Sequence, residues 1–214
     1  GITRGRWFAT AIALAACSPA PRERIVLGVA HVPVLGLVFI AEAKGYFRAH
    51  GLEVEHRRFV TGRDALVALG AGRVDVATVF ETPIVLRAAR DGDLRLLTTL
   101  HVSNRSTRLV ARGDRGIAGE PDLRGKRVGV PRDTIAEYFL GVLLAYGGVA
   151  AGEVTVVDVA PGRAAESLAA GELDAVVTWP PHAAEVRRLL EPVGAVEIGS
   201  EVYTELSALV TRAG

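Results

Sequence analysis

The sequence lacks several features by which common classes of protein are identified. It has no methionine, even at position 1, and one cysteine among its 214 residues. A disulfide within the chain is therefore excluded, and we expect the original start residue to be missing. Basic and acidic residues are nearly equal in number, 25 against 24, and the basic ones are scattered. We expect no nucleic-acid partner, because such partners require a basic patch.

The N-terminal apolar segment, Trp7–Ala16, is shorter than the roughly 20 residues needed to span a bilayer. It follows two arginines and leads through Leu-Ala-Ala into Cys17, which resembles the lipobox of bacterial lipoproteins. We therefore predict a signal peptide over residues 1–16, a lipid on Cys17 and a linker over residues 17–23. A buried N-terminal helix with a free thiol is the alternative.

One segment of the chain is repeated. Residues 71–80 read AGRVDVATVF and residues 170–179 read AGELDAVVTW. Each copy has the end of an Ala/Leu-rich helix, a glycine that stops it, an aspartate at the turn and an apolar strand ending in an aromatic residue. Apolar runs of this kind are typical of parallel strands buried on both faces. The repeat predicts two similar α/β lobes, and the aspartates, Asp75 and Asp174, are interpreted as structural.

Strand and helix patterns alternate along both halves, which favours mostly parallel sheets. The predicted strands are 24–29, 52–59, 76–80, 94–101, 106–112, 127–130, 154–159, 175–178, 195–198 and 206–212. The predicted helices are 34–44, 62–70, 135–146, 161–170 and 181–190. A further helix is predicted after the third strand, with Thr82 as its N-cap and Pro83 in its first turn.

These patterns predict a discontinuous first lobe, residues 24–106 and 207–214, and a second lobe of residues 107–206. The chain would cross between the lobes on the strands that begin near 107 and 206. A return strand without a helix behind it leaves an apolar face uncovered, so we expect the chain to be C-terminally truncated.

Ligands of such sheets bind outside the carboxyl ends of the strands, and helix N-termini there attract anions. The helix starts at that edge give the candidate residues Thr61, Gly62, Glu81, Thr82, Asp133 and Thr134. An ordinary N-cap is the alternative role for each polar side chain, and the two roles are compatible.

Two aromatic residues, Phe80 and Trp179, end corresponding strands and are predicted to enclose a ring or alkyl chain, with core packing as the alternative. His31 follows the first strand and is a further candidate. Asn104 and Tyr203 flank the crossovers. A cleft-facing Glu81 would favour an amine-bearing ligand.

The sequence shows no catalytic constellation, no metal-ligand spacing and no phosphate-binding loop. We therefore predict no catalytic residue, no metal and no cofactor.

Four ordered motifs resemble one known family. Residues 41–54 are similar to A-x-x-K-G-Y-F-x-x-x-G-L-x-V, residues 71–75 to its G-x-V-D turn, residues 122–130 to D-L-x-G-K-x-V-G-V, and residues 171–179 to its second G-x-x-D-A with an aromatic. This family comprises the substrate-binding proteins of ABC importers, in the nitrate/sulfonate/taurine and thiamine-precursor branch.

The resemblance implies an α/β fold of the type II periplasmic-binding-protein class, with two doubly wound lobes that close on a solute. It implies a monomeric binding protein in the cell envelope, in the periplasm or on the outer face of the cytoplasmic membrane, that serves an ABC permease and ATPase. The solute would be a sulfonate or taurine, a nitrate-like anion or a pyrimidine-like compound.

Two positions depart from the family pattern. Asp133 stands where many relatives have glycine, and Pro180 where many have glutamate. An acid at Asp133 could cap the helix, but it would also compete with an anionic ligand.

The alternative function is a biosynthetic enzyme on the same fold, of the thiamine-pyrimidine or menaquinone type. Such an enzyme would not need the lipobox. A regulator's effector domain is a third possibility, but it would need a DNA-binding helix pair ahead of Arg24, and the sequence has none there.

Overall fold

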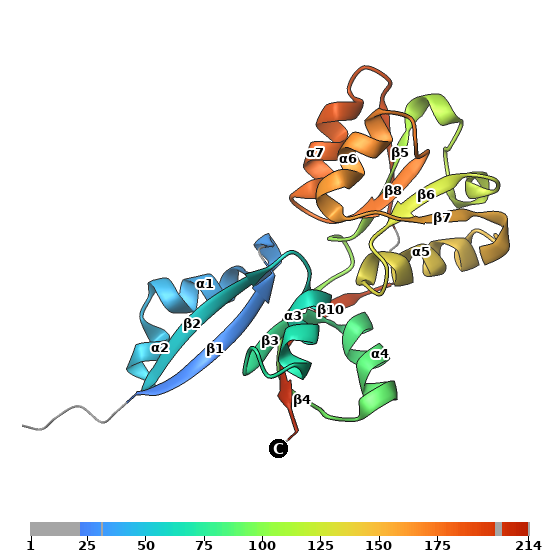
Figure 1. Ribbon diagram of the computed structural model, residues 1–214. Helices are drawn as coiled ribbons and strands as arrows, with labels where there is room; N and C mark the ends of the chain where they lie inside the picture. Colours follow the sequence, from blue (N-terminus) through green and yellow to red (C-terminus); the bar gives the residue numbers. More distant parts are fainter. Residues whose placement is uncertain (1–21, 31, 200–202, 214) are drawn as a thin grey trace, which may run out of the picture.

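The computed structural model describes residues 22–30, 32–199 and 203–213. The predicted signal segment, Cys17 and His31 lie outside these residues. The described chain forms two five-stranded sheets, each with helices of its own (Figure 1). We call the sheet containing the first strand, with its helices, the first lobe, and the other sheet, with its helices, the second lobe.

The first sheet has the strand order β2-β1-β3-β10-β4. Its strands are β1 (Glu23–Ala30), β2 (Leu52–Phe59), β3 (Val76–Phe80), β4 (Leu94–Ser103) and β10 (Glu205–Arg212). β1 is parallel to β2 and β3, whereas β10 is antiparallel to both of its neighbours, β3 and β4.

The second sheet has the order β7-β6-β8-β5-β9. Its strands are β5 (Arg108–Arg112), β6 (Arg127–Val130), β7 (Thr155–Asp158), β8 (Ala175–Thr178) and β9 (Ala195–Ile198). β5 is antiparallel to β8 and β9, and β6 is parallel to β7 and β8. Each sheet therefore contains one inserted antiparallel strand, which enters directly after the chain leaves the other sheet. The sequence predicted mostly parallel sheets and did not predict these insertions.

The helices of the first lobe are the 3-10 helix η1 (Pro33–Leu35), α1 (Gly36–Ala43), α2 (Tyr46–Ala49), α3 (Gly62–Gly70) and α4 (Glu81–Asp91). The second lobe has α5 (Ile135–Tyr146), α6 (Pro161–Ala169) and α7 (His182–Leu190), with the 3-10 helices η2 (Gly113–Arg115), η3 (Glu120–Leu123) and η4 (Ala151–Glu153). The short helix α2 was not predicted. It follows Gly45, whose φ of 70° is the left-handed conformation that glycine adopts without strain.

The largest buried cluster runs through both lobes. It joins Val29 and Leu35 of the first lobe to Phe139 and Trp179 of the second. A second cluster lies under α3, and a third lies between the second sheet and helices α6 and α7. The two lobes therefore share apolar packing and are not merely linked by the crossovers.

The repeated aspartates have the same role in both lobes. The carboxylate of Asp75 accepts the N–H of Val26 in β1 at 2.8 Å, and that of Asp174 accepts the N–H of Arg127 in β6, also at 2.8 Å. The backbone N–H groups of both aspartates return a bond to the same strand residues. The repeat thus ties each turn to the first strand of its sheet.

The lobes differ at their edges. β4 is an edge strand of the first sheet, and its side chains Leu96 and Leu97 are 55% and 54% exposed.

In the described part of the chain, no helix is long and apolar enough to cross a membrane.

Candidate functional site

A pocket lies between the two lobes, at the carboxyl ends of their parallel strands. The space between its lining residues is about 340 Å³ with open solvent included, and about 20 Å³ of it can hold the centre of a water molecule. Its lining residues are Ala30, Val32, Val60, Thr61, Gly62, Arg63, Phe80 and Pro83 from the first lobe and Thr134, Ile135 and Trp179 from the second. We call this pocket the cleft.

Thr61 and Gly62 bring the start of α3 to the cleft. Thr61 is the N-cap, and its hydroxyl accepts the N–H of Asp64 at 3.1 Å, while the Asp64 carboxylate accepts the N–H of Thr61 at 3.2 Å. A Cβ on Gly62 would lie 3.1 Å from the carbonyl oxygen of Thr78, so glycine allows the helix to start close to β3. The N–H groups of Gly62 and Arg63, which precede the capped amide of Asp64, have no intrahelical acceptor and can bind an anion.

Thr134 brings the start of α5 to the cleft from the opposite lobe. Its hydroxyl accepts the N–H of Ala136 at 3.3 Å and donates to the carbonyl of Pro131 at 2.7 Å. Thr134 is 4% exposed, so it is both a cap and a wall of the cleft. Two helix N-termini therefore face the same space.

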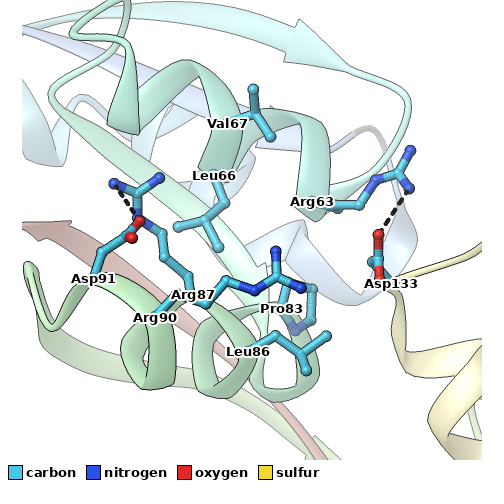
Figure 2. A pocket seen from close by; sticks show the side chains of 9 residues that line it. All are labelled: Arg63, Leu66, Val67, Pro83, Leu86, Arg87, Arg90, Asp91 and Asp133. Carbon is cyan, nitrogen blue, oxygen red and sulfur yellow. Dashed lines mark ion pairs between the residues drawn. The ribbon is translucent and has the colours of Figure 1, made fainter.

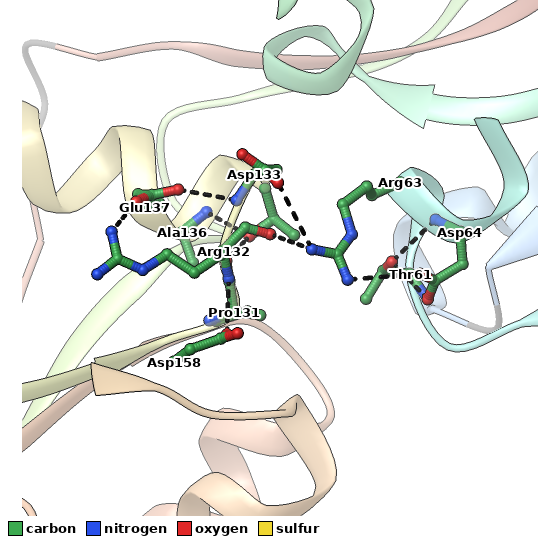
Figure 3. Close-up of polar contacts among 10 residues, drawn as sticks. Thr61, Arg63, Asp64, Pro131, Arg132, Asp133, Ala136, Glu137 and Asp158 are labelled. Atoms are coloured by element: carbon green, nitrogen blue, oxygen red, sulfur yellow. Dashed lines mark hydrogen bonds and ion pairs between the residues drawn. The ribbon is translucent and has the colours of Figure 1, made fainter. Parts of the chain in front are cut away.

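Asp133 is not the cap of α5. Its φ is 54°, a left-handed conformation that aspartate tolerates and glycine adopts freely, which accounts for the glycine of the family pattern. Its side chain is 59% exposed. Its N–H donates to Glu137 at 2.8 Å, and Glu137 also pairs with Arg132 (Figure 3).

Arg63 links the two lobes, and the sequence analysis did not single it out. Its guanidinium donates to the carbonyl oxygen of Arg132 at 2.8 Å and lies 3.9 Å from the carboxylate of Asp133 (Figures 2 and 3). A basic residue in the first turn of a cleft-facing helix was the available signal. Arg63 thus lies at the cleft between the two helix starts, where its guanidinium is paired with Asp133 and also with Asp64, 3.6 Å away.

A second groove of about 570 Å³ lies between α3 and α4 and shares Arg63 and Pro83 with the cleft (Figure 2). Its side chains are Arg63, Leu66, Val67, Pro83, Leu86, Arg87, Arg90, Asp91 and Asp133. Arg87 is held there by Asp93 at 2.6 Å and Asp91 at 3.6 Å. The cap residues Thr61 and Thr134 line the cleft and are absent from the lining of this groove, so the cleft is the better candidate for binding.

The two predicted aromatic residues both line the cleft. Trp179 is 7% exposed and belongs to the shared core, whereas Phe80 is half-buried and packs against that core. His182 lies beside Trp179, with ring centroids 6.4 Å apart, and burial lowers the pKa of His182. Phe80 and Trp179 therefore combine core packing with cleft lining.

The prediction that Thr82 caps α4 is wrong. The helix begins at Glu81, and Phe80 occupies the cap position without a side-chain cap bond among the described residues. The Glu81 carboxylate accepts the N–H of Leu206 at 3.0 Å instead. Burial, and to a smaller extent the nearby Glu205 charge, raise the pKa of Glu81.

Five candidate residues are not among those that line the cleft: Glu81, Thr82, Asn104, Asp133 and Tyr203. The backbone carbonyl oxygen of Asn104 accepts a hydrogen bond from the Arg108 guanidinium at 3.4 Å. The sequence analysis also missed the apolar walls formed by Val32 and Ile135, which carry no motif. Among the described residues, no group of three or more His, Cys, Asp or Glu side chains could hold a metal ion.

Two α/β lobes, each with an inserted return strand, and a cleft between them define a type II periplasmic-binding-protein fold. The alkanesulfonate-binding protein SsuA from Xanthomonas axonopodis pv. citri, solved bound to MOPS, superposes with a TM-score of 0.74 at 20% identity, over 88% of this chain and 65% of that one. The SsuA protein of Escherichia coli gives a TM-score of 0.70 at 18% identity, over 88% of this chain and 65% of that one.

The sequence profile described as NMT1/THI5 like matches residues 33–196. The chain belongs to this family. The taurine-binding periplasmic protein of Escherichia coli (strain K12) is 26% identical over 143 residues, which are 66% of this chain and 44% of that protein. A Brucella abortus (strain 2308) protein named only as a binding protein is 27% identical over 176 residues, 81% of this chain and 54% of that one. The chain thus spans about half the length of these curated relatives.

Proposed function

We propose that this protein is the solute-binding component of an ABC importer and that it captures a small organic anion of the sulfonate class in the cleft. The carrying observation is that α3 and α5, one from each lobe, begin at the same pocket with Arg63 between them. Helix N-termini and a guanidinium all favour a negatively charged group.

The aromatic residues support an organic rather than a purely inorganic solute. Phe80 and Trp179 offer flat apolar surface to an alkyl chain or ring. The names of the relatives describe binding of taurine and sulfonates and no catalysis, which favours this function over a biosynthetic enzyme. Nitrate and pyrimidine-like compounds are the other solutes to be tested.

Binding can be tested by calorimetric titration of the full chain with ethanesulfonate, taurine, nitrate and a pyrimidine. We expect a sulfonate to bind, and Arg63→Gln to weaken it at least about tenfold, because a charge-assisted hydrogen bond contributes about 1.5–3 kcal/mol. Arg90→Gln is the matched control, because Arg90 is exposed and lines the second groove but not the cleft, and it should leave the affinity unchanged. If no anion or pyrimidine binds, the proposed function is wrong.

The proposal includes an envelope location, a lipid on Cys17, a monomeric state and delivery of the solute to a permease with its ATPase. Its support is the sequence around Cys17 and the word "periplasmic" in the name of the taurine-binding relative. Mass spectrometry of the membrane fraction should find a diacylglyceryl group on Cys17, and Cys17→Ser should release the protein. An unmodified wild-type cysteine would contradict the anchor.

A further inference from the structure

A groove that adjoins the cleft lies where the end of β2 faces the start of α7. It is lined by Arg58, Phe59 and Val60 of the first lobe and by His182 of the second. Val60 lines the cleft as well, so the two spaces are neighbours. We call the space between these four residues the outer groove.

The outer groove offers more room than the cleft. About 350 Å³ of it can hold the centre of a water molecule, against about 20 Å³ in the cleft. A single water molecule needs roughly 10–15 Å³ of such space, so the cleft by itself holds about one. An organic solute whose acidic group reaches the starts of α3 and α5 therefore extends beyond the cleft. The outer groove is a neighbouring space large enough to take the remainder.

The guanidinium of Arg58 has no protein partner in the part of the chain that the structure describes. The preceding residue, Arg57, donates instead to Glu55 and to the carbonyl of Arg73. Successive residues of a strand point to opposite faces of the sheet, so Arg58 and Arg57 lie on different faces of β2. Arg58 therefore brings to the outer groove a positive charge that forms no ion pair with a described carboxylate.

His182 brings a hydrogen-bond donor to the outer groove from the opposite lobe. It is the first residue of α7 and is half-buried, and its ring centroid lies 6.4 Å from that of Trp179. Burial lowers the pKa of His182, so its ring is neutral at about pH 7 and has one N–H to donate. The ring nitrogens make no hydrogen bond with the described residues. A guanidinium and an imidazole without protein partners thus face one groove from two lobes.

These two groups favour an acidic group of the solute. A carboxylate has two oxygen atoms, which can accept N–H groups from the guanidinium and from the imidazole at the same time. Phe59 and Val60 add apolar surface against which carbon atoms of a solute can pack. Arg58 is close in sequence to Thr61, the cap of α3, and their Cα atoms are within about 11 Å of each other. A short carbon chain can therefore reach from the helix start to the outer groove.

We propose that Arg58 and His182 form an outer subsite for a second acidic group of the solute, so that the preferred solute is a sulfonate that also carries a carboxylate. The assignment rests on the proposed function, because the sulfonate group would lie at the helix starts and Arg63. The bound carboxylate would contact the first lobe through Arg58 and the second through His182. A solvated Arg58 with no role in binding is the competing explanation.

The test is calorimetric titration of the full chain with two matched pairs of probes. Sulfoacetate is compared with ethanesulfonate, and sulfopropionate with propanesulfonate. In each pair, a carboxylate replaces the terminal methyl group. We expect the carboxylate to strengthen binding at least about fivefold in one or both pairs, as for an ion pair that stays partly solvated. Arg58→Gln should reduce this preference to less than about twofold.

Arg57→Gln is the matched control, because Arg57 carries the same charge at the adjacent position on the other face of β2, and this variant should retain the preference. His182→Leu removes the imidazole donor and should reduce the preference at least about twofold. Circular dichroism reports the folding of each variant, and His182→Leu serves if Arg58→Gln does not fold.

The outcomes separate the subsite from the proposed function. Equal affinities within both pairs, or a preference that Arg58→Gln leaves unchanged, would overturn the subsite and leave the proposed function intact. An equal loss of preference in Arg57→Gln and Arg58→Gln would indicate a general effect of charge and would also overturn the subsite. If none of the probes binds, the proposed function is wrong and the subsite with it.

Discussion

The two lobes share one topology but differ in how completely their sheets are covered. In the second lobe, all four residues of β8 are buried, and α5 packs on one face while α6 and α7 pack on the other (Figure 1). In the first lobe, the edge strand β4 exposes Leu96, Leu97 and Val102 by more than half. The same order of strands therefore gives a closed core in one lobe and an open apolar edge in the other.

The lobes also differ where they meet the cleft. The turns that hold the sheets are equivalent, as the bonds of Asp75 and Asp174 show. The residues after the corresponding strands are not equivalent, since Phe80 is followed by a half-buried glutamate and Trp179 by two prolines. The two lobes thus share their arrangement of strands and turns, whereas the residue types that they bring to the cleft differ.

Truncating the two cleft aromatics should have unequal effects. Trp179→Ala removes a side chain that is 7% exposed within the shared core and should lower the free energy of unfolding by about 3–5 kcal/mol. Phe80→Ala removes a half-buried ring and should cost about 1–2 kcal/mol. Urea unfolding followed by circular dichroism measures both, and equal losses would contradict the assignment of Trp179 to the core.

The paired glycines of the first strands provide a second comparison. A Cβ on Gly129 would lie 2.7 Å from Leu173 Cδ1 and 2.8 Å from Val159 Cγ1, whereas on Gly28 the nearest atom would be 3.2 Å away, on Phe59. Gly129→Ala should therefore destabilise by about 1–3 kcal/mol through overpacking. Gly28→Ala should stay within about 1 kcal/mol of wild type, because the lower entropy of the unfolded chain offsets milder crowding. Thermal unfolding measures the stability of both variants. If Gly28→Ala lost more stability than Gly129→Ala, the second lobe would not be the more tightly packed one.

The capped helix α3 has an uncapped counterpart in α6, whose N-cap residue, Ala160, makes no side-chain cap bond in the described structure. Thr61→Ala removes the capping box of α3 and should cost about 1 kcal/mol. Thr82→Ala is the matched control and should change stability by less than about 0.5 kcal/mol, because Thr82 lies inside α4. Urea midpoints of the two variants should differ accordingly, and similar midpoints would indicate that the box of α3 adds no stability.

Glu81 in α4 and His182 in α7 should make the free energy of unfolding change with pH in opposite directions. Burial raises the pKa of Glu81 above its ordinary 4.5, so the folded state retains a proton that the unfolded chain releases, and stability falls as pH rises from there. Burial lowers the pKa of His182 below 6.5, so the unfolded chain takes up a proton first and stability falls as pH drops from there. Relative to wild type, Glu81→Gln should gain stability with rising pH and His182→Gln with falling pH. The measurement is the free energy of unfolding of wild type and both variants between pH 4 and 8. A variant whose curve ran parallel to that of wild type would show that the replaced group is solvated in the folded state.

Much of the fold was readable from local patterns. The limits of β2 and β6 agree with the sequence prediction, because alternation and glycine stops act over a few residues. The insertion of β5 and β10 was not readable, since an antiparallel strand between two parallel ones depends on pairing with distant segments. Local propensity also favoured Thr82 as a cap, but the bond from the N–H of Leu206 to Glu81 joins residues 125 positions apart.

The candidate site was predicted in part. Thr61, Thr134, Phe80 and Trp179 lie together, because the carboxyl ends of parallel strands share one edge. Arg63 was missed, since its acceptor is the carbonyl of Arg132, 69 positions away. The conformation of Asp133 was hidden as well, because its residue type alone does not reveal a positive φ.

The inserted strand β10 has a consequence for the order of synthesis. Every strand of the second sheet lies between residues 108 and 198, so that sheet can assemble as soon as this continuous stretch has been made. The first sheet must wait for residues 205–212, which fill the gap between β3 and β4. Contacts so distant along the chain form slowly. During translation the first lobe therefore remains unfinished until almost the last described residue, with β3 paired only to β1 and β4 still outside the sheet.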